Sequence, residues 1–489
     1  MPPDEEEDVS APTAERARET VEAVPEPVET ETVRSAEDEA FLGEGSRVAV
    51  IGGGPAGSLF AYFLLEMAER IDTRLTVDIY EPRQFARPGA VGCNMCGGII
   101  SESLVQNLAI DGVFLANDIV QRGIDSYQLH TDVGSVRISL PNDEVRIGAV
   151  HRGGGPQDVT QPKWVSFDDR LLSNAIERGA SVVQARVQDV GRTVDGRPTL
   201  TTKEGERRVY ELVVVATGVN TSILKTFEGL GIGYVRPKLT KTLIREYFLG
   251  QDVINRHLGT SMHVFLLDIP GLEFAALIPK GDYVTMAMLG DDLDSAAGDA
   301  FARSPEVRAV MPPGWDPEGR SCQCLPHINV HGVDKPFADR VVFIGDSGVT
   351  RLYKDGIGAA YRTAKAAART ALFEGVSEQA FREHYLPVCR RIQSDNRIGE
   401  IAFFLTRVAQ RLRLLRFAIL AIVRDEQAND RRPRLSGVLW DMFSGSAPYG
   451  DIFARMLSPI LIARGALAMP GALVDTIRRK PGSPQEVEA

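Results

Sequence analysis

Short apolar runs and stretches with helical spacing follow one another along the 489-residue chain. An apolar run at 47–51 leads into a glycine turn, then into a segment with apolar residues at helical spacing, and a second apolar run follows at 75–82. A strand, a helix and a second strand in this order predict a βαβ unit, the usual opening of a doubly wound parallel sheet. The expected fold class is therefore α/β.

Other segments alternate apolar and polar residues with a period of two. This pattern covers much of 117–150 and 245–290, and it predicts half-buried antiparallel strands. After residue 377 the pattern is helical to the end. We expect a tail at 1–44, a discontinuous Rossmann-like nucleotide-binding domain at 46–116, 163–238 and 336–376, an interleaved antiparallel-sheet substrate domain at 117–162 and 239–335, and a helical C-terminal region at 377–480.

The acidic charge is confined to the first segment. Met1 to Glu44 holds 15 acidic and 3 basic residues, a net charge of −12, whereas the whole chain carries −11. The rest is therefore nearly neutral, which gives no basic footprint for a nucleic acid. A segment this acidic and poor in apolar residues is typical of a disordered tail, either a solubilising extension or an arm that docks a partner.

A glycine motif with phosphate-binding spacing lies in the first βαβ unit, at Gly52-Gly53-Gly54-Pro55-Ala56-Gly57. Gly52 permits the tight turn, Gly54 lets the backbone approach a pyrophosphate, and Gly57 allows the helix to pack closely on the strand. Glu81 ends the second strand, 24 residues past Gly57, where it would accept hydrogen bonds from a ribose. Together these features predict a dinucleotide site.

The order of several further segments resembles the flavoprotein superfamily of aromatic hydroxylases and geranylgeranyl reductases. The resemblance covers roughly residues 46–385 and rests on the glycine motif, Glu81, Arg170 in a helix, Ala216-Thr217-Gly218 after a strand, Gly345-Asp346 after another, and Gly356 and Gly358 at the start of a helix. It implies that the cofactor is FAD. It also implies that Asp346 contacts the ribityl chain, that Arg170 lies near the pyrophosphate, and that the helix starting at Gly356 points its positive end at the flavin ring.

Within this superfamily the chain is most similar to the geranylgeranyl reductase group, through Cys96-Gly97-Gly98 and the segment at 279–290. That group tends to show Tyr-x-Trp-x-Phe-Pro where this chain has Phe274-Ala275-Ala276-Leu277-Ile278-Pro279. The resemblance implies an oxidoreductase that reduces carbon–carbon double bonds of an isoprenoid-like lipid. An FAD-dependent monooxygenase and a flavoprotein that passes electrons to a quinone are the alternatives.

Only one dinucleotide motif is present, because Arg152 to Pro156 lacks the flanking strand and helix and is predicted to be a loop. A second domain for a nicotinamide cofactor is therefore not expected. We expect the electrons to come from transiently bound NAD(P)H or from a protein donor.

Four cysteines flank the expected flavin site in pairs, Cys93 with Cys96 and Cys322 with Cys324. Our hypothesis is that these thiols converge beside the flavin, as a dithiol relay or as a thiolate metal or iron–sulfur site. The alternative is that they are small buried residues that line a pocket. We assign no metal ligand and no catalytic acid or base.

The expected location is the cytoplasm, since no secretory signal opens the chain and the cysteine count is odd. The longest strongly apolar stretch near the C-terminus, Phe417 to Val423, has 7 residues, so we expect no segment long and apolar enough to cross a bilayer. Arginines and leucines interleave from Arg407 to Arg424. A helix of this kind either lies on an anionic membrane or over a lipid channel, or packs on the core with its arginines in water.

Overall fold

A computed structural model of the chain describes residues 41–139, 147–160, 163–291, 293–429 and 433–478. The predicted tail lies outside these residues except for its last four. Leu42 is buried in the core, and the carboxylate of Glu44 pairs with Arg74 at 2.7 Å. The packed part of the chain therefore begins ahead of the predicted boundary.

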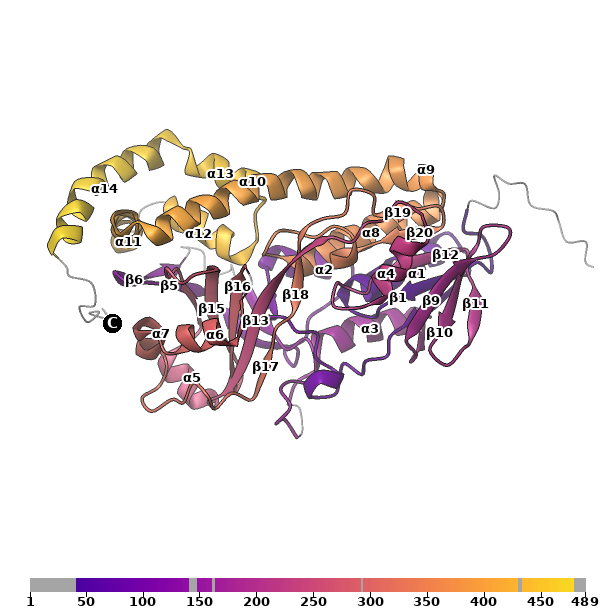
Figure 1. The fold of residues 1–489 in the computed structure, drawn as a ribbon, viewed down its shortest axis with the longest axis horizontal. Coiled ribbons are helices and arrows are strands. Elements are labelled where there is room, and N and C mark those ends of the chain that lie inside the picture. Colours follow the sequence, from indigo (N-terminus) through magenta and orange to yellow (C-terminus); the bar gives the residue numbers. More distant parts are fainter. Residues whose placement is uncertain (1–40, 140–146, 161–162, 292, 430–432, 479–489) are drawn as a thin grey trace, which may run out of the picture. The chain divides into compact units, whose positions relative to one another are not determined.

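A six-stranded sheet contains the βαβ unit at the start of the fold (Figure 1). Its strands, in spatial order, are β19 (Phe337–Ala338), β20 (Val341–Phe343), β12 (Leu212–Val215), β1 (Arg47–Ile51), β2 (Thr76–Tyr80) and β8 (Ser181–Val183). All neighbours are parallel except β19, which runs antiparallel to β20. The chain leaves β1 toward β2 on one side and later returns to β12 on the other, so a switch point lies at the carboxyl end of β1.

Alternate residues of this sheet pack on opposite layers. Val48 and Val50 of β1 face a cluster built with helices α1 (Pro55–Arg70), α3 (Phe167–Glu177) and α8 (Gly356–Phe373). Ala49 and Ile51 face a second cluster. That cluster is built with helix α4 (Ile223–Gly229) and with strands β9 (Val187–Arg192) and β10 (Pro198–Thr202), which form a three-stranded antiparallel sheet with β11 (Arg207–Val209). Burial on both faces explains why these strands are apolar runs without alternation.

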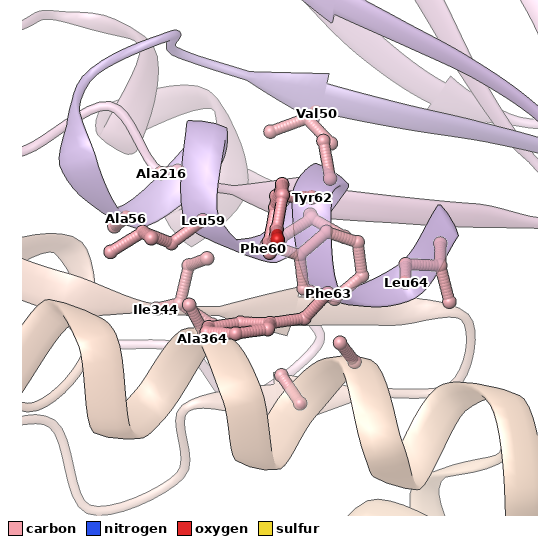
Figure 2. Packing of buried hydrophobic residues seen from close by; sticks show 14 of the residues in the cluster. Val50, Ala56, Leu59, Phe60, Tyr62, Phe63, Leu64, Ala216, Ile344 and Ala364 are labelled. Atoms are coloured by element: carbon pink, nitrogen blue, oxygen red, sulfur yellow. The ribbon is translucent and has the colours of Figure 1, made fainter. Parts of the chain in front are cut away.

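Helices α1 and α8 pack against each other beneath the sheet (Figure 2). Phe60 and Phe63 of α1 are buried there, and Ala364 of α8 lies beside them. Small alanines along α8 let the two helices approach closely, which holds the first turn of each helix in a fixed place. Both first turns belong to the site described below.

A larger sheet follows the predicted antiparallel pattern. Its strands, in spatial order, are β17 (Cys322–Cys324), β13 (Lys238–Phe248), β16 (Tyr283–Gly290), β15 (Leu272–Lys280), β14 (Ser261–Phe265), β5 (Ser126–Thr131) and β6 (Gly134–Ser139), with β18 (His327–His331) also paired to β13. All neighbours are antiparallel except β14 and β5. A small sheet of β3 (Ile99–Ile100), β7 (Ile147–Val150) and β4 (Val120–Ile124) lies apart from it in strand order.

The predicted fold class is confirmed: a doubly wound α/β fold with an antiparallel sheet and a helical C-terminal region. The half-buried pattern expected for the large sheet is wrong at β15, where all nine residues are buried. Ala275 and Leu277 face helices α5 (Gln251–His257), α6 (Ser295–Ala302) and α7 (Pro305–Val310), whereas Ala276 and Ile278 face the opposite cluster. The predicted domain boundaries stay predictions.

The C-terminal helices cover that opposite face of the large sheet. Helix α2 spans Glu102–Ile110. After α8, the helical segments are α9 (Glu378–Ala380), a π-helical turn (Phe381–Tyr385), α10 (Leu386–Arg411), α11 (Arg413–Ala428), α12 (Leu435–Ser444), α13 (Tyr449–Met456) and α14 (Pro459–Arg478). Phe417 and Leu420 of α11 and Trp440 and Phe443 of α12 pack in the same cluster as Ala276. Part of the Arg/Leu segment at 407–424 is thus a packed helix whose Arg416 is itself buried.

Within the described residues, α14 has the length and composition of a membrane-crossing helix over Pro459–Ile477, and 11% of that window is buried. The prediction that the chain lacks a segment of this length and composition is therefore wrong. The apolar character was hidden because Arg464, Gly465, Pro470 and Gly471 divide the segment into short apolar runs.

Candidate functional site

A cavity of about 820 Å³ opens at the switch point of the six-stranded sheet. It extends from Glu81 at the end of β2, past the glycine turn after β1, to Asp346 and the start of α8, and then along the inner face of the large sheet. In α/β sheets of this kind, ligands bind at the carboxyl ends of the strands at the switch point.

Ten of the thirteen residues predicted to bind the cofactor line this cavity: Gly52, Gly54, Pro55, Ala56, Glu81, Ala216, Gly218, Gly345, Asp346 and Gly356. The other three, Gly57, Gly358 and Arg170, do not line it.

Gly52, Gly54 and Gly57 differ in why a glycine occupies the position. Gly52 has a φ of +104°, and a Cβ there would lie 2.5 Å from the carbonyl oxygen of Ala216. A Cβ on Gly57 would lie 1.9 Å from the carbonyl oxygen of Gly52. A Cβ on Gly54 meets no atom closer than the side-chain nitrogen of Asn94, at 3.5 Å. The protein itself requires Gly52 and Gly57, whereas Gly54 leaves space that only a ligand would fill.

Glu81 and the first turn of α1 form the polar end of the cavity. The Glu81 carboxylate accepts hydrogen bonds from the backbone N–H groups of Gly53 and Arg83, both at 2.9 Å. Burial raises the pKa of Glu81, and these two hydrogen bonds oppose the rise. No side chain caps the N-terminus of α1, and Gly54, Pro55 and Ala56 face the cavity. Backbone donors and the helix dipole therefore favour an anionic group at this point.

Arg170 is displaced from the role that the resemblance implies. Its guanidinium lies 3.6 Å from the Glu177 carboxylate, and its side chain is 42% exposed. Asp168, two residues earlier in α3, instead points inward and accepts two hydrogen bonds from Arg152, at 2.9 and 2.8 Å. Two residues differ by about 200° around a helix, so the two side chains must point in nearly opposite directions. The arginines that line the cavity are Arg83, Arg152, Arg186 and Arg351.

Gly345 and Asp346 form a turn directly after β20. Gly345 has a φ of +59°, and a Cβ there would lie 2.9 Å from the Cβ of Ala56 in α1. Asp346 lines the cavity; burial raises its pKa, while the neighbouring Thr350 side chain and the charge of Arg152 oppose the rise. The turn therefore presents an inward carboxylate next to the first turn of α1.

The segment before α8 brings a lysine into the cavity. Tyr353 and Asp355 both adopt left-handed backbone conformations, with φ of 56° and 53°. Such strain at two non-glycine residues is typical of functional segments. Between them, Lys354 lines the cavity and places its Nζ 3.4 Å from the centroid of the Phe274 ring. Burial lowers the pKa of Lys354 to about 7.

Gly358 does not line the cavity but makes room for the side chain of Asp355. A Cβ at Gly358 would lie 2.2 Å from a carboxylate oxygen of Asp355, so glycine lets that carboxylate lie against the first turn of α8. Burial raises the pKa of Asp355, whereas Arg362, at 3.1 Å, and Arg351 oppose the rise. Gly356 and Ile357 of the same turn face the cavity.

Beyond Lys354 the cavity becomes an apolar chamber. Its wall includes apolar side chains of β14, β15 and β16 together with Phe443 of α12: Met262, Phe274, Ala276, Ile278, Ala287, Leu289 and Phe443. Ala276 and Ala287 lie opposite each other in the register of β15 and β16. Two alanines at neighbouring wall positions leave the chamber wide where larger residues would narrow it.

Several solved protein structures superpose on this chain over most of its length. No protein-family model matches the chain, and no curated protein matches its sequence. A geranylgeranyl bacteriochlorophyll reductase-like protein from Thermoplasma acidophilum superposes with a TM-score of 0.60 at 13% identity, over 84% of this chain and 98% of that one. A flavoprotein/dehydrogenase from Cytophaga hutchinsonii gives 0.55 at 16% identity, over 88% and 100%. The flavin-dependent brominase Bmp2 gives 0.53 at 16% identity, over 89% and 100%.

The chain has the fold of these flavoproteins. At identities this low the likeness concerns the fold, and the chemistry must be argued from the cavity.

The four cysteines gather at one edge of this flavoprotein fold. Cys322 and Cys324 lie on β17 near Cys93, and Cys324 also lies near Cys96. Of the four, Cys96 lines the cavity. Burial raises the pKa of Cys93, raises that of Cys322 to about 12, and raises that of Cys324 further. These thiols are therefore held protonated, which is unfavourable for a thiolate nucleophile.

The metal or iron–sulfur form of the thiol hypothesis finds no support in the described part of the chain, where no three His, Cys, Asp or Glu side chains are arranged to hold a metal ion. The dithiol relay stays a prediction.

The residues that sequence reasoning missed are Lys354 and Arg152. Lys354 lies two residues before Gly356, which is part of the resemblance, and this position is the signal that would have drawn attention to it.

Proposed function

We propose that the chain is an FAD-dependent oxidoreductase that reduces carbon–carbon double bonds in an isoprenoid-like lipid. The observation that carries the proposal is one continuous cavity with a polar end built on the glycine turn and an apolar end, with Lys354 where the two meet. Cofactor and substrate would then share the cavity, as a transfer between them requires.

The polar end fits the parts of FAD in order. Glu81 would accept hydrogen bonds from the adenosine ribose, and the free N–H groups of the first turn of α1 would bind the pyrophosphate. The Asp346 carboxylate would bind hydroxyls of the ribityl chain, and the first turn of α8 would face the flavin ring. A bound phosphate would occupy the space that Gly54 leaves beside the backbone. When bound and reduced, FAD supplies a hydride.

Lys354 is the candidate proton donor. Saturation of a double bond needs a hydride at one carbon and a proton at the other. In the described part of the chain no carboxylate lies within ion-pair distance of Lys354, and its ammonium lies over the Phe274 ring. With a pKa near 7, this ammonium releases a proton far more readily than an exposed lysine does. Its position in the apolar chamber would bring the proton to a substrate that cannot supply one.

The apolar wall would orient the lipid. Phe274, Ile278 and Leu289 offer no hydrogen-bond donors or acceptors in their side chains, so they would exclude water and hold a hydrocarbon chain through its apolar surface. The small side chains of Ala276 and Ala287 would leave the chamber wide enough for the methyl branches of such a lipid. We further propose that the reductant is NAD(P)H or a protein donor that binds transiently.

A single anaerobic experiment tests the proposal. The purified protein with bound FAD is reduced with dithionite, an isoprenoid lipid with several double bonds is added, and the flavin absorbance and lipid mass are followed. Reoxidation of the flavin with a gain of two hydrogens per double bond in the lipid is expected. A flavin that stays reduced with every isoprenoid tested would refute this substrate class.

A monooxygenase is the second candidate, since a peptidyl tryptophan dihydroxylase and the halogenase PltM also share the fold, with TM-scores of 0.50 and 0.54. Reoxidation that requires air and yields a product labelled by isotopic oxygen would favour it. The quinone-reducing alternative would instead show reoxidation by a soluble quinone with the isoprenoid unchanged.

A further inference from the structure

Helix α14 packs one face on the rest of the protein. It runs beside α11 (Figure 1), and its Leu461 and Ala472 are buried while Ala468 and Met469 pack against the apolar cluster beneath the C-terminal helices. On this inner face, Arg464 pairs at 2.9 Å with a carboxylate oxygen of Glu426, whose side chain is fully buried. The inner face is thus fixed by packing and by a charge pair.

The outer face of α14 is apolar and exposed. Exposed residues recur along it at helical spacing: Ile460, Ala463, Leu467, Pro470, Val474 and Ile477. Leu467 is 80% exposed and Ile477 is 75% exposed. Ile462 and Leu473 add to the same exposed set. Isolated exposed apolar residues are ordinary, but a continuous apolar stripe over five helical turns marks a surface that binds something apolar.

Charge along and after this helix indicates which apolar partner fits. Asp475 is the one acidic residue of α14, and it is partly buried. Arg478 is the last residue of the helix, and the sequence continues with Arg479 and Lys480, which makes three consecutive basic residues. An apolar stripe followed by a basic cluster matches a surface with an acyl interior and anionic headgroups.

We propose that α14 docks the protein on an anionic lipid bilayer, lying in the plane of the membrane with its outer face among the acyl chains. The helix does not cross the bilayer in this arrangement. Crossing would pull Arg464 into hydrocarbon and leave the buried Glu426 without its partner, and both changes are unfavourable.

The docking surface connects to the chamber through a single apolar cluster. Met262, Phe274 and Phe443, which line the chamber, belong to the same cluster as Ala472 of α14. Docking would therefore bring the helices that cover the chamber to the membrane. This inference goes beyond the proposed reaction and stands without it, because vesicle binding is measured without turnover.

Flotation with vesicles tests the docking surface. The full-length protein is mixed with vesicles of phosphatidylcholine alone or of equal parts phosphatidylcholine and phosphatidylglycerol. We expect the protein to float with the anionic vesicles and to bind more weakly when salt is raised. The variant with Leu467→Asp and Ile477→Asp should lose at least about tenfold in bound fraction, because two charges would enter the acyl region. The matched control carries Val194→Asp and Val235→Asp, two exposed valines far from α14 in the sequence, and should float like the wild type.

A second measurement keeps the proposal falsifiable if a variant misfolds. Leu467→Trp should show a blue-shifted emission when anionic vesicles are added, with quenching by lipids labelled near the top of the acyl chain. Absence of flotation and of the blue shift in correctly folded protein would overturn the proposal. A wild-type dimer in solution that becomes a monomer in the double aspartate variant, with no vesicle binding, would overturn it in favour of contact between two copies.

Discussion

The ammonium nitrogen of Lys354 lies 3.4 Å from the centroid of the Phe274 ring, inside the apolar chamber of the cavity. The ring's π-face stabilises the charged form, while the surrounding apolar side chains stabilise the neutral form. Burial wins, since the pKa of Lys354 falls to about 7. A lysine with this pKa changes its charge in the range where enzymes work.

Turnover should therefore depend on pH through Lys354. The ammonium form, which carries the proton to be donated, is present below about pH 7 and is lost above it. We expect the rate of reoxidation of reduced enzyme by lipid to fall as pH rises through this value. Lys354→Met should lower the rate by about 100-fold and remove this pH dependence. Lys365→Met, on the exposed side of α8, is the control and should keep both.

Two glycines of the same motif should fail in different ways. Gly54→Val should give a folded protein without FAD, because its side chain would enter the space left for the pyrophosphate. Gly57→Val should destabilise the fold itself, since its Cβ would collide with the backbone of Gly52. Flavin absorbance and thermal unfolding of both variants separate these outcomes. A yellow, FAD-loaded Gly54→Val protein would contradict the cavity assignment.

Arg152 should contribute to the stability of the protein, whereas Arg170 should contribute little to stability or to FAD binding. Arg152→Ala should lower the free energy of unfolding by about 3–5 kcal/mol, because it leaves the buried Asp168 carboxylate without its bidentate partner. Arg170→Ala should change neither stability nor FAD affinity appreciably, since its exposed pair with Glu177 contributes little. Denaturant titrations and flavin fluorescence measure the two quantities. A large loss of FAD affinity in Arg170→Ala would instead support the role implied by the resemblance.

Narrowing the chamber should block the lipid and spare the cofactor. Ala276→Trp would fill the wall between Phe274 and Ile278, so reoxidation by a branched isoprenoid should slow by about 10- to 100-fold, with FAD content and dithionite reduction unchanged. Ala276→Val should fall between this variant and the wild type. Equal rates in all three proteins would show that the lipid does not enter this chamber.

The thiols on β17 should react slowly. Burial raises the pKa of Cys322 to about 12 and that of Cys324 further, so at pH 8 less thiolate is present than on an ordinary cysteine. Labelling of the native protein by a disulfide reagent should be at least about tenfold slower at these positions than in unfolded protein, and it should accelerate as pH rises. Peptide mapping after a timed pulse measures it. Rapid labelling of Cys322 or Cys324 that appears only when the FAD is reduced, as a disulfide opens to two thiols, would support the dithiol relay.

Local spacing was enough for the parts of the site that depend on one turn of chain. The tight turn at Gly52, the close approach at Gly57 and the carboxylate at the end of β2 each follow from a few neighbouring residues, so the sequence alone determined them. The same holds for the strand and helix types, because apolar periodicity within a segment is set by the layer that the segment must cover.

Tertiary structure decided which distant side chains meet. Arg170 and Asp168 lie in one helix, but only the packing of α3 determines that the carboxylate points inward and the guanidinium outward. Lys354 gains its low pKa from burial among residues that are far away in sequence. The outer face of α14 is exposed because its other face is held on α11. Burial and charge environment are properties of the assembled layers, and no segment read by itself contains them.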